Sequence, residues 1–395
     1  MISRSHRECS LPIRNPSSDA HEVIVIGVGG MGSAACVELA RRGASVLGIE
    51  QFRLGHDRGS SHGESRIIRK AYFEHPDYVP LLHRAYELWN KLEKDTGRTL
   101  FRQTGLVLSG PADGETIQGA RLSAEQHRLE LQNFTVSEAL RRFPGFVFPA
   151  EHDVAFEPGA GTLLVDDCVQ TQIDEARRLG ATMIENERVV EWSSDGQSVC
   201  VKTTSNEYHA NSLVITAGAW ANECLSSLGL PLNVVRKFVG WFQCHSTNFR
   251  ENRGCPTFYF ELPHGTFYGF PSFDGATIKV AEHSGGQSVN NPLNVDRACH
   301  PSDFERLNSF LSLCLSDVDP DPVRHSICLY TRTPDQHFVI DLHPEWKNVA
   351  FAAGFSGHGF KFCPVIGEVL ADLTQKGQAS LPIDFLSRQR SSLIV

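Results

Sequence analysis

The stretch from Val23 to Glu50, VIVIGVGGMGSAACVELARRGASVLGIE, decides the fold of this chain. Its first four residues, Val23 to Ile26, are apolar and predict a buried parallel strand. Gly27, Gly29 and Gly32 follow with the spacing G-x-G-x-x-G. The first glycine permits a tight turn, the second lets the backbone approach a pyrophosphate, and the third lets the next helix pack closely on the sheet.

The residues after these glycines complete a dinucleotide-binding pattern. A helix is expected over Ser33 to Arg42, with its N-terminal amides directed at phosphate groups. A second strand is expected over Ala44 to Ile49. Glu50 ends that strand, where a carboxylate accepts hydrogen bonds from ribose hydroxyls. An ordinary βαβ unit does not explain this acid, so the pattern predicts a dinucleotide site, for either NAD or FAD.

Composition narrows the classes of protein. A length of 395 residues predicts two or three domains, and a net charge of -9 argues against nucleic acid and anionic membranes as partners. No apolar run approaches the ~20 residues that cross a bilayer. Residues 1–20 lack a signal-peptide core and are predicted to be a disordered extension. The eleven cysteines form no CxxC pair, which favours a reducing compartment and gives no metal site.

The segment Gly59 to Tyr72, GSSHGESRIIRKAY, carries three basic or titratable side chains at helical spacing. On a helix, His62, Arg66 and Arg69 would share one face. Two interpretations remain open from the pattern alone. One is a solvated basic face, and the other is an anion-binding stripe.

Further along, the chain predicts helices over 78–92, 123–128, 137–143 and 166–179, and a crossing without a clear period over 143–161. Strands are expected over 181–190 and 198–203, and an apolar strand over 212–220 runs into Ala217-Gly218-Ala219. Residues 231–330 predict an antiparallel sheet. In ATIKVAEH, Lys279 and His283 fall on one face, although such a lysine usually faces solvent.

A second glycine-rich segment lies near the end of the chain. Cys328 and Tyr330 share a face of a strand over 326–330, where a lone cysteine is normally an inert core residue. Gly354, Gly357 and Gly359 then lead into a helix over 364–373, another place suited to an anionic group. Two such loops at opposite ends of the chain predict a cofactor domain assembled from separated segments.

Three stretches together resemble a known family: GSSHGESRIIRKAY, the strand with Cys328 and Tyr330, and HFVIDLHPEWKNVAFAAGFSGHGFKF. They are similar to the monomeric sarcosine oxidase and N-methyltryptophan oxidase family, whose wider relatives are the FAD amine oxidases of the D-amino acid oxidase superfamily. The resemblance extends from about Val23 to about Asp372. Within it, the GSSHG form looks more like the sarcosine and pipecolate oxidases of animal peroxisomes.

The resemblance implies a two-domain α/β (α+β) fold, with a Rossmann-like FAD-binding domain and an antiparallel-sheet substrate domain whose segments interleave. The FAD-binding domain is expected over 21–105, 159–225 and 326–395. The substrate domain is expected over 106–158 and 226–325.

The resemblance also implies FAD rather than NAD, attached covalently through Cys328, with His62 and Arg66 near the flavin. Arg69 and Lys361 would hold a substrate carboxylate, and Lys279 would face the position where oxygen reacts. Tyr268, His283 and Tyr330 would line the substrate cavity. The expected cofactor-binding residues are Gly27, Gly29, Gly32, Glu50, His62, Arg66, Val189, Ala217, Gly218, Cys328, Gly354, Gly357, Gly359 and Lys361.

The implied activity is oxidation of a secondary N-methyl amino acid such as sarcosine to an imine, which hydrolyses to an aldehyde and an amino acid, while O2 becomes H2O2. A monomer without nucleic-acid or membrane partners is expected. A cytoplasmic location is expected too, because Leu393-Ile394-Val395 is not the peroxisomal address.

Departures from the family keep other substrates open. Ser61-His62 replaces the two histidines common in the bacterial enzymes, and Tyr259 stands where those enzymes have a methionine in the pocket. A cyclic imino acid or a bulkier N-alkyl amino acid is therefore an alternative. An NAD-dependent dehydrogenase is a further alternative. A binding protein that lost the chemistry is disfavoured by the joint presence of Lys279, Cys328 and the Arg69–Lys361 pair.

Overall fold

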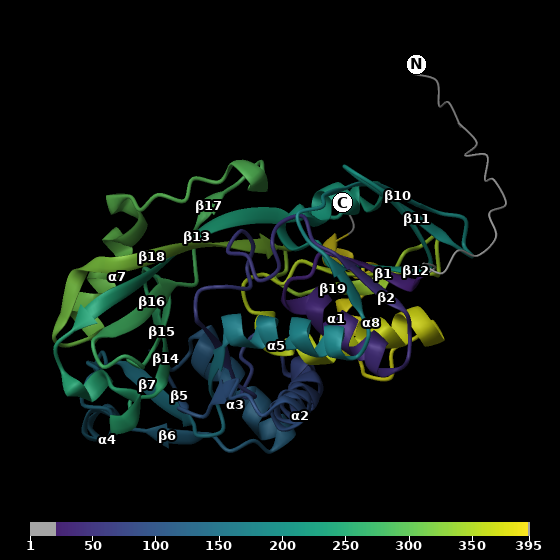
Figure 1. Ribbon diagram of the computed structural model, residues 1–395. Coiled ribbons are helices and arrows are strands. Elements are labelled where there is room, and N and C mark those ends of the chain that lie inside the picture. Colours follow the sequence, from purple (N-terminus) through teal and green to yellow (C-terminus); the bar gives the residue numbers. More distant parts are fainter. Residues whose placement is uncertain (1–20, 394–395) are drawn as a thin grey trace.

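A computed structural model describes residues 21–393 of the chain, so the expected extension over 1–20 lies outside the described residues. Two large sheets lie side by side in Figure 1, one around β1 and β2 and the other around β13 to β18. The fold is the mixed α/β arrangement that the sequence predicts.

The first sheet has eight strands and a parallel core. Strands β9, β2, β1, β12 and β20 pair in parallel, while β10, β11 and β19 are antiparallel additions. The bounds are β1 His21–Ile26, β2 Val46–Ile49, β9 Thr182–Ile184, β10 Val189–Ser194, β11 Val199–Thr203, β12 Glu207–Ile215, β19 Val339–Leu342 and β20 Val349–Ala353.

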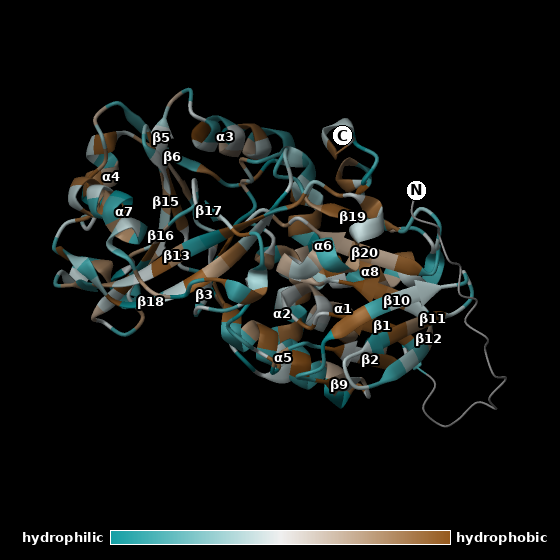
Figure 2. Ribbon diagram, turned by 90° about the horizontal axis from the view of Figure 1, so that it is seen from above, coloured by the Kyte–Doolittle hydropathy of each residue, from teal (hydrophilic) through white to brown (hydrophobic). Residues whose placement is uncertain are grey.

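Residues 23–26 of β1 are all apolar because both faces of this part of the strand are covered. Val23 and Val25 pack into one core cluster, and Ile24 and Ile26 pack into another. Figure 2 shows the hydrophobic colour of this strand. A parallel strand covered on both faces has no solvent side that would select polar residues.

Helices cover this sheet: α1 Gly30–Arg41, α2 Val79–Thr96, α5 Val165–Arg178 and α8 Cys363–Lys376. Helix α1 begins three residues before the predicted Ser33, directly after Gly29. It packs closely on α8, since a Cβ on Gly367 would lie 2.6 Å from the backbone carbon of Ala34. The helix that follows the predicted dinucleotide turn therefore packs against a helix more than 300 residues later in the chain.

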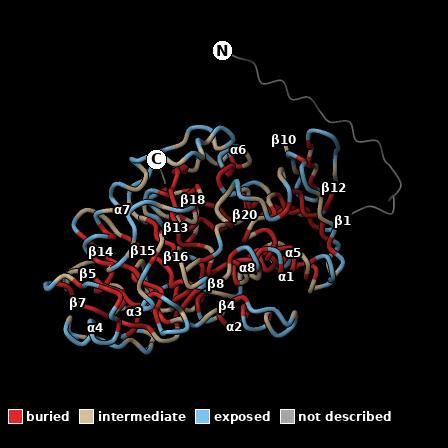
Figure 3. Tube along the Cα trace, turned by 60° about the vertical axis from the view of Figure 1, so that its left-hand side comes forward, coloured by how far each residue is buried: buried red, intermediate tan, exposed pale blue. Residues whose placement is uncertain are grey.

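The second sheet has nine strands and is antiparallel except for the parallel pair β14 and β5. Its strands are β5 Leu106–Pro111, β6 Gln132–Phe134, β7 His152–Glu157, β13 Asn233–Cys244, β14 Thr257–Leu262, β15 Gly265–Phe270, β16 Thr277–Glu282, β17 Gln287–Ser288 and β18 Val318–Arg332. Helices α3 Glu115–His127, α4 Val136–Arg142 and α7 Pro301–Cys314 accompany it. Its core is rich in phenylalanine, and Figure 3 shows the buried segments concentrated within each half.

A small third sheet joins β3 Ser65–Ile68, β8 Gly161–Leu164 and β4 Phe101–Arg102. The helix proposed for His62, Arg66 and Arg69 is wrong, because residues 65–68 pair with β8 as a strand. His62 and Arg69 are each only 4% exposed, so these side chains do not form a solvated basic face either. The crossing predicted over 143–161 likewise contains the regular strand β7.

The division into domains stays a prediction. Strands β5 to β7 and β13 to β17 fall within the ranges predicted for the substrate domain. Strand β18 runs through residue 326, where the final FAD-binding segment was placed. Strand β18 is therefore part of the antiparallel sheet by its pairing with β13. In the sequence it crosses the predicted boundary between the two domains.

Candidate active site

The candidate site consists of two adjoining cavities. The larger one lies at the carboxyl ends of β1, β2 and β12, with about 1370 Å³ of empty space. Its position matches the rule that open α/β sheets bind ligands beyond the carboxyl ends of their strands. Gly27 has a φ of +83°, and a Cβ there would lie 2.7 Å from the Thr216 carbonyl oxygen. Gly29 differs, because a Cβ there would meet nothing nearer than Ser61 Oγ at 3.7 Å. Gly29 thus leaves open space beside the turn, as a bound pyrophosphate requires.

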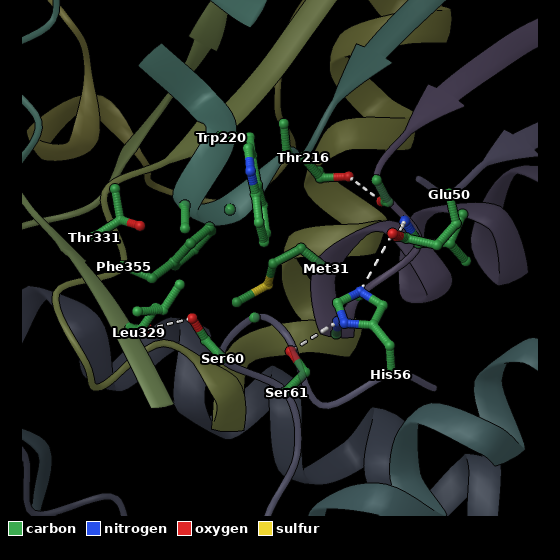
Figure 4. A pocket seen from close by; sticks show the side chains of 18 of the residues that line it. Met31, Glu50, His56, Ser60, Ser61, Thr216, Trp220, Leu329, Thr331 and Phe355 are labelled. Atoms are coloured by element: carbon green, nitrogen blue, oxygen red, sulfur yellow. Dashed lines mark hydrogen bonds and ion pairs between the residues drawn. The ribbon is translucent and has the colours of Figure 1, made fainter. Parts of the chain in front are cut away.

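Glu50 lies in the wall of this cavity and is fixed by several donors (Figure 4). Its Oε2 accepts the Val28 amide at 2.9 Å, and its Oε1 accepts the Phe52 amide at 3.1 Å. His56 Nε2 lies 3.2 Å from the same Oε1. These contacts hold the carboxylate at the place where the sequence predicts a ribose.

Two polar atoms in the wall have no hydrogen-bond partner among the described residues. They are Trp220 Nε1 and Thr331 Oγ1, and both side chains are buried. Buried polar atoms are normally paired. Donors without protein partners, beside open glycines and a fixed carboxylate, fit a cavity built for a dinucleotide.

Most of the predicted cofactor-binding residues line this cavity: Gly27, Gly29, Glu50, Arg66, Val189, Ala217, Gly218, Cys328, Gly354, Gly357 and Gly359. Gly32 does not, because it packs against the turn, where a Cβ would lie 1.8 Å from the Gly27 carbonyl oxygen. Sequence reasoning missed His56, Ser60, Glu187 and Trp220. Ser60 lies inside the GSSHG segment, and Trp220 ends the strand predicted over 212–220, but neither residue belongs to a spacing that predicts cofactor binding.

His62 lies behind the wall and ties two segments together. One ring nitrogen contacts the Gly59 carbonyl at 3.1 Å, and the other contacts Ser326 Oγ at 3.3 Å. Burial, and then Arg66, lower the pKa of His62 to about 3. The imidazole is therefore neutral and supports the loop beside the cavity.

Arg66 connects the loop with Cys328. Its Nη2 donates to the Ser60 carbonyl at 2.7 Å and lies 3.6 Å from Cys328 Sγ. The Cys328 side chain comes from β18 and is buried at the cavity wall. The thiol thus lies at the cavity wall with a guanidinium beside it.

A smaller cavity, with about 470 Å³ of empty space, adjoins the first and shares Arg66, Gly357 and Phe360 with it. Its other lining residues are Ile67, Arg69, Phe73, Glu74, Tyr259, Tyr268, His283, His358 and Lys361. The lining thus combines aromatic rings with a few charged groups, as ligand sites commonly do.

Arg69 already has an anionic partner. Its Nη2 contacts both carboxylate oxygens of Glu74, at 2.7 and 2.6 Å, and its Nη1 donates to the Ala71 carbonyl at 3.1 Å. Burial alone would raise the pKa of Glu74, but Arg69, His358 and Lys361 together lower it to about 2. A substrate carboxylate at Arg69 therefore has to share this guanidinium with Glu74.

Lys361 is the second buried cation. Its Nζ donates to the His358 carbonyl at 2.6 Å, which leaves two of its hydrogens for a ligand. Burial, and then Arg69, lower the pKa of Lys361 to about 7. The His358 ring is held between Tyr72 OH and the Gln336 carbonyl, which keeps the backbone beneath Lys361 in place.

Tyr268, Tyr330 and His283 form a chain of polar groups across the boundary of the two cavities. The tyrosine hydroxyls lie 3.5 Å apart, and Tyr330 OH lies 3.4 Å from His283 Nδ1. Burial, then His358 and Lys237, lower the pKa of His283 to about 3. The imidazole is therefore neutral and adds no positive charge to the cavity.

Lys279 is buried, so the solvent-facing interpretation is wrong. Its Nζ donates to the Gly63 carbonyl at 2.6 Å, the Ser65 carbonyl at 2.8 Å and Ser65 Oγ at 3.0 Å. Burial, and then Arg66, hold the pKa of Lys279 well below its usual value. The lysine thus fixes the segment that precedes Arg66.

Within residues 21–393, no helix is long and apolar enough to cross a membrane. Cys200, Glu207 and His209 have ligand-type atoms within 4.8 Å of one another, on the outer hairpin of β11 and β12. This group is remote from both cavities, and the prediction that the protein uses no metal stays a prediction.

Comparisons with known proteins define the class. Residues 22–373 match the family described as FAD dependent oxidoreductase (DAO), and the chain belongs to this family. It is 39% identical over 376 residues to a monomeric sarcosine oxidase of a Bacillus species, covering 94% of this chain and 97% of the relative. It is 33% identical over 354 residues to the N-methyl-L-tryptophan oxidase of Salmonella enteritidis, covering 89% and 94%.

Among solved structures, the chain resembles NikD, an amino acid oxidase essential for nikkomycin biosynthesis, in its open form. The TM-score is 0.82 at 25% identity, covering 94% of this chain and 98% of NikD. The protein is thus an FAD-dependent oxidoreductase. The family match favours FAD over NAD as the cofactor.

Proposed function

We propose that this enzyme oxidises a secondary N-methyl amino acid such as sarcosine, with O2 as the acceptor and H2O2 as a product. One observation carries the proposal. The smaller cavity adjoins the larger cavity and presents two buried cations, Arg69 and Lys361, among aromatic side chains. This arrangement suits a small molecule with one carboxylate, and relatives named sarcosine oxidase share 36–41% identity with the chain.

The protein's own residues bind and orient the substrate in this proposal. The carboxylate binds Lys361 and shares Arg69 with Glu74, and each charged hydrogen bond contributes roughly 1.5 to 3 kcal/mol. Anchoring this end holds the N-methyl group toward the shared wall of the two cavities, which is a proximity effect. The neutral His283 lines the cavity and adds no positive charge beside the substrate's ammonium group. FAD, when bound, supplies the acceptor for a hydride equivalent.

The cofactor is proposed to lie along the larger cavity. Gly27, Gly29 and Glu50 would hold its dinucleotide part, while Arg66 and Cys328 would adjoin the ring, with a covalent link to Cys328. The monomeric state, the use of O2, the absence of nucleic-acid and membrane partners, and the cytoplasmic location are proposed as well. The name of the bacterial relatives supports the monomer.

Carboxylate binding is expected to weaken as the pH rises through about 7. Lys361 is charged below its pKa of about 7 and neutral above it, so only the protonated form attracts an anion. Above pH 7, affinity for acetate should fall about tenfold per pH unit until the raised pKa of the complex is reached, with proton uptake on binding. Titration calorimetry in two buffers measures both quantities.

The matched control for that pH dependence is Lys361→Met, which keeps the length of the side chain and removes its charge. This variant should bind acetate weakly at every pH and take up no proton. A parent protein whose affinity is constant between pH 6 and pH 9 would contradict the role of Lys361.

An enzyme that prefers a larger secondary amine is the second candidate, and Tyr259 favours it. This side chain lines the smaller cavity, 6% exposed, with its ring 5.0 Å from Phe73 and 6.1 Å from His283. We expect sarcosine to be a substrate but not the best one. A panel of N-methyl, cyclic and glycated amino acids, scored by peroxide release, tests both candidates. Sarcosine ahead of every larger amine would reject the second, and silence across the panel would reject both.

A further inference from the structure

The turn that carries His283 into the smaller cavity is held by two cations that the proposed reaction does not use, the buried Lys237 and the half-buried Arg332. It follows β16 and comprises His283, Ser284, Gly285 and Gly286, and is called the His283 turn below. Three successive carbonyl oxygens of this turn accept hydrogen bonds from side chains of neighbouring strands.

Lys237 supplies two of these hydrogen bonds. It lies on β13, is 4% exposed, and directs its Nζ to the Ser284 carbonyl and to the Gly285 carbonyl, the latter at 3.4 Å. Arg332, at the end of β18, donates from Nη2 to the His283 carbonyl at 3.1 Å. A lysine is seldom buried to this extent unless its ammonium group is paired.

The turn also lies very close to strand β13. Gly285 and Gly286 have φ values of +61° and +108°, and a Cβ on Gly286 would lie 2.3 Å from Val235 and 2.9 Å from Lys237 Cδ. The backbone is therefore pressed onto the aliphatic part of Lys237 while its carbonyls receive the ammonium. Moving Lys237 would move the turn.

The position of the turn sets one wall of the substrate cavity. The His283 ring lies among Tyr259, Tyr268 and Tyr330, with ring centroids 6.1, 6.3 and 5.6 Å away. Its backbone amide is fixed separately, by the Thr266 carbonyl at 2.8 Å. The hydrogen bonds from Lys237 and Arg332 to the carbonyl groups of the turn thus control how far the His283 side chain enters the cavity.

We propose that Lys237 is a positioning residue that fixes the His283 turn and thereby restricts the size of substrate that the cavity accepts. The proposal deepens the proposed function and rests on it for the identity of the substrates. Arg332 assists from β18, but Lys237 holds the two residues of the turn that lie beyond His283.

Two variants and one control test this role. Lys237→Met removes every donor and keeps the length of the side chain, and Lys237→Gln keeps one amide donor for the Ser284 carbonyl. Arg236→Met is the matched control, because Arg236 is the next buried cation on β13, is 6% exposed, and binds Asp303, Asp296 and Ala298 instead. Each of the three variants removes a buried cation from β13. Only the two Lys237 variants remove a side chain that is hydrogen-bonded to the His283 turn.

The first measurement needs no turnover. Hydrogen–deuterium exchange in peptides covering residues 280–290 should accelerate roughly tenfold in Lys237→Met, less in Lys237→Gln, and not at all in Arg236→Met, because the side chain of Lys237 donates to carbonyls of the turn and that of Arg236 does not. The second measurement is the ratio of kcat/KM for N-methylphenylalanine to kcat/KM for sarcosine. It should rise about tenfold in Lys237→Met and stay within twofold of the parent in Arg236→Met.

Exchange or selectivity unchanged in Lys237→Met would overturn the proposal, and so would an equal shift in Arg236→Met. Faster exchange combined with an equal loss of kcat/KM for both substrates would also overturn the proposal, because Lys237 would then stabilise the turn without affecting selectivity. If the parent protein oxidises neither amine, the proposed function fails instead, and the exchange result still shows whether Lys237 fixes the turn.

Discussion

Lys279→Met protein is expected to react with oxygen at least a hundredfold more slowly than the parent, while its reaction with substrate changes only modestly. Oxygen accepts its first electron as an anion, and a fixed cation nearby stabilises that charge without reorganisation. At ~4 Å and an effective dielectric of about 20, one charge pair is worth on the order of 4 kcal/mol, or about three powers of ten in rate. Water and neighbouring charges reduce that upper value to the expected hundredfold.

The surroundings of Lys279 sharpen this prediction. Its three hydrogen bonds go to uncharged groups of Gly63 and Ser65, so no carboxylate is hydrogen-bonded to its ammonium group. Burial depresses the pKa of Lys279, and an anion arriving nearby raises it again. The group is thus protonated most strongly when negative charge is present.

Stopped-flow absorbance separates the two half-reactions and measures the prediction directly. Because Lys279 also fixes residues 63–65, FAD content and thermal stability of the variant are recorded alongside. Reoxidation at the parent rate would assign Lys279 a structural role only. An equal slowing of both half-reactions would point to a displaced cofactor.

Cys328→Ser protein is expected to release all of its flavin on acid precipitation, whereas the parent keeps it. Cys328 Sγ lies in the wall of the larger cavity, 3.6 Å from Arg66 Nη2, and serine cannot form the same thioether. Cys224 provides the matched control, because it lines the same cavity. Flavin absorbance of the pellet and of the supernatant gives the result.

Two outcomes would contradict the assignment to Cys328. Flavin that remains attached in Cys328→Ser would place the link elsewhere, and release from Cys224→Ser would point to that cysteine. A parent that already releases its flavin would show that the cofactor is bound without a covalent link.

The cofactor half could be predicted from the sequence because its signals are local. Val23 to Glu50 carries a strand, three glycines, a helix and an acid in order, and each has its own steric or electrostatic reason. The structure has the strands and the helix as predicted, with α1 starting three residues early. The FSGHGFKF segment was equally local, since glycines and a following helix are adjacent in the chain.

Residues 59–72 could not be predicted in the same way. His62, Arg66 and Arg69 have helical spacing, but pairing with β8, about 100 residues later in the chain, makes this segment a strand. The ion pair between Arg69 and Glu74 could not be predicted either, because the turn over 70–73 that brings these residues together has no periodic sequence pattern. Lys237 faces the His283 turn only through strand pairing in the second sheet, which single-sequence patterns do not define.

Strand β18 gives the molecule one further property. Its pairing with β13 places it in the antiparallel sheet, and Cys328 and Tyr330 on it form part of the larger cavity. A ligand held there contacts β1 and β2 from one half and β18 from the other. Its binding free energy therefore adds to the folding stability of both halves at once, by mass action on the native state. The protein without its cofactor is for this reason the form most exposed to unfolding and proteolysis.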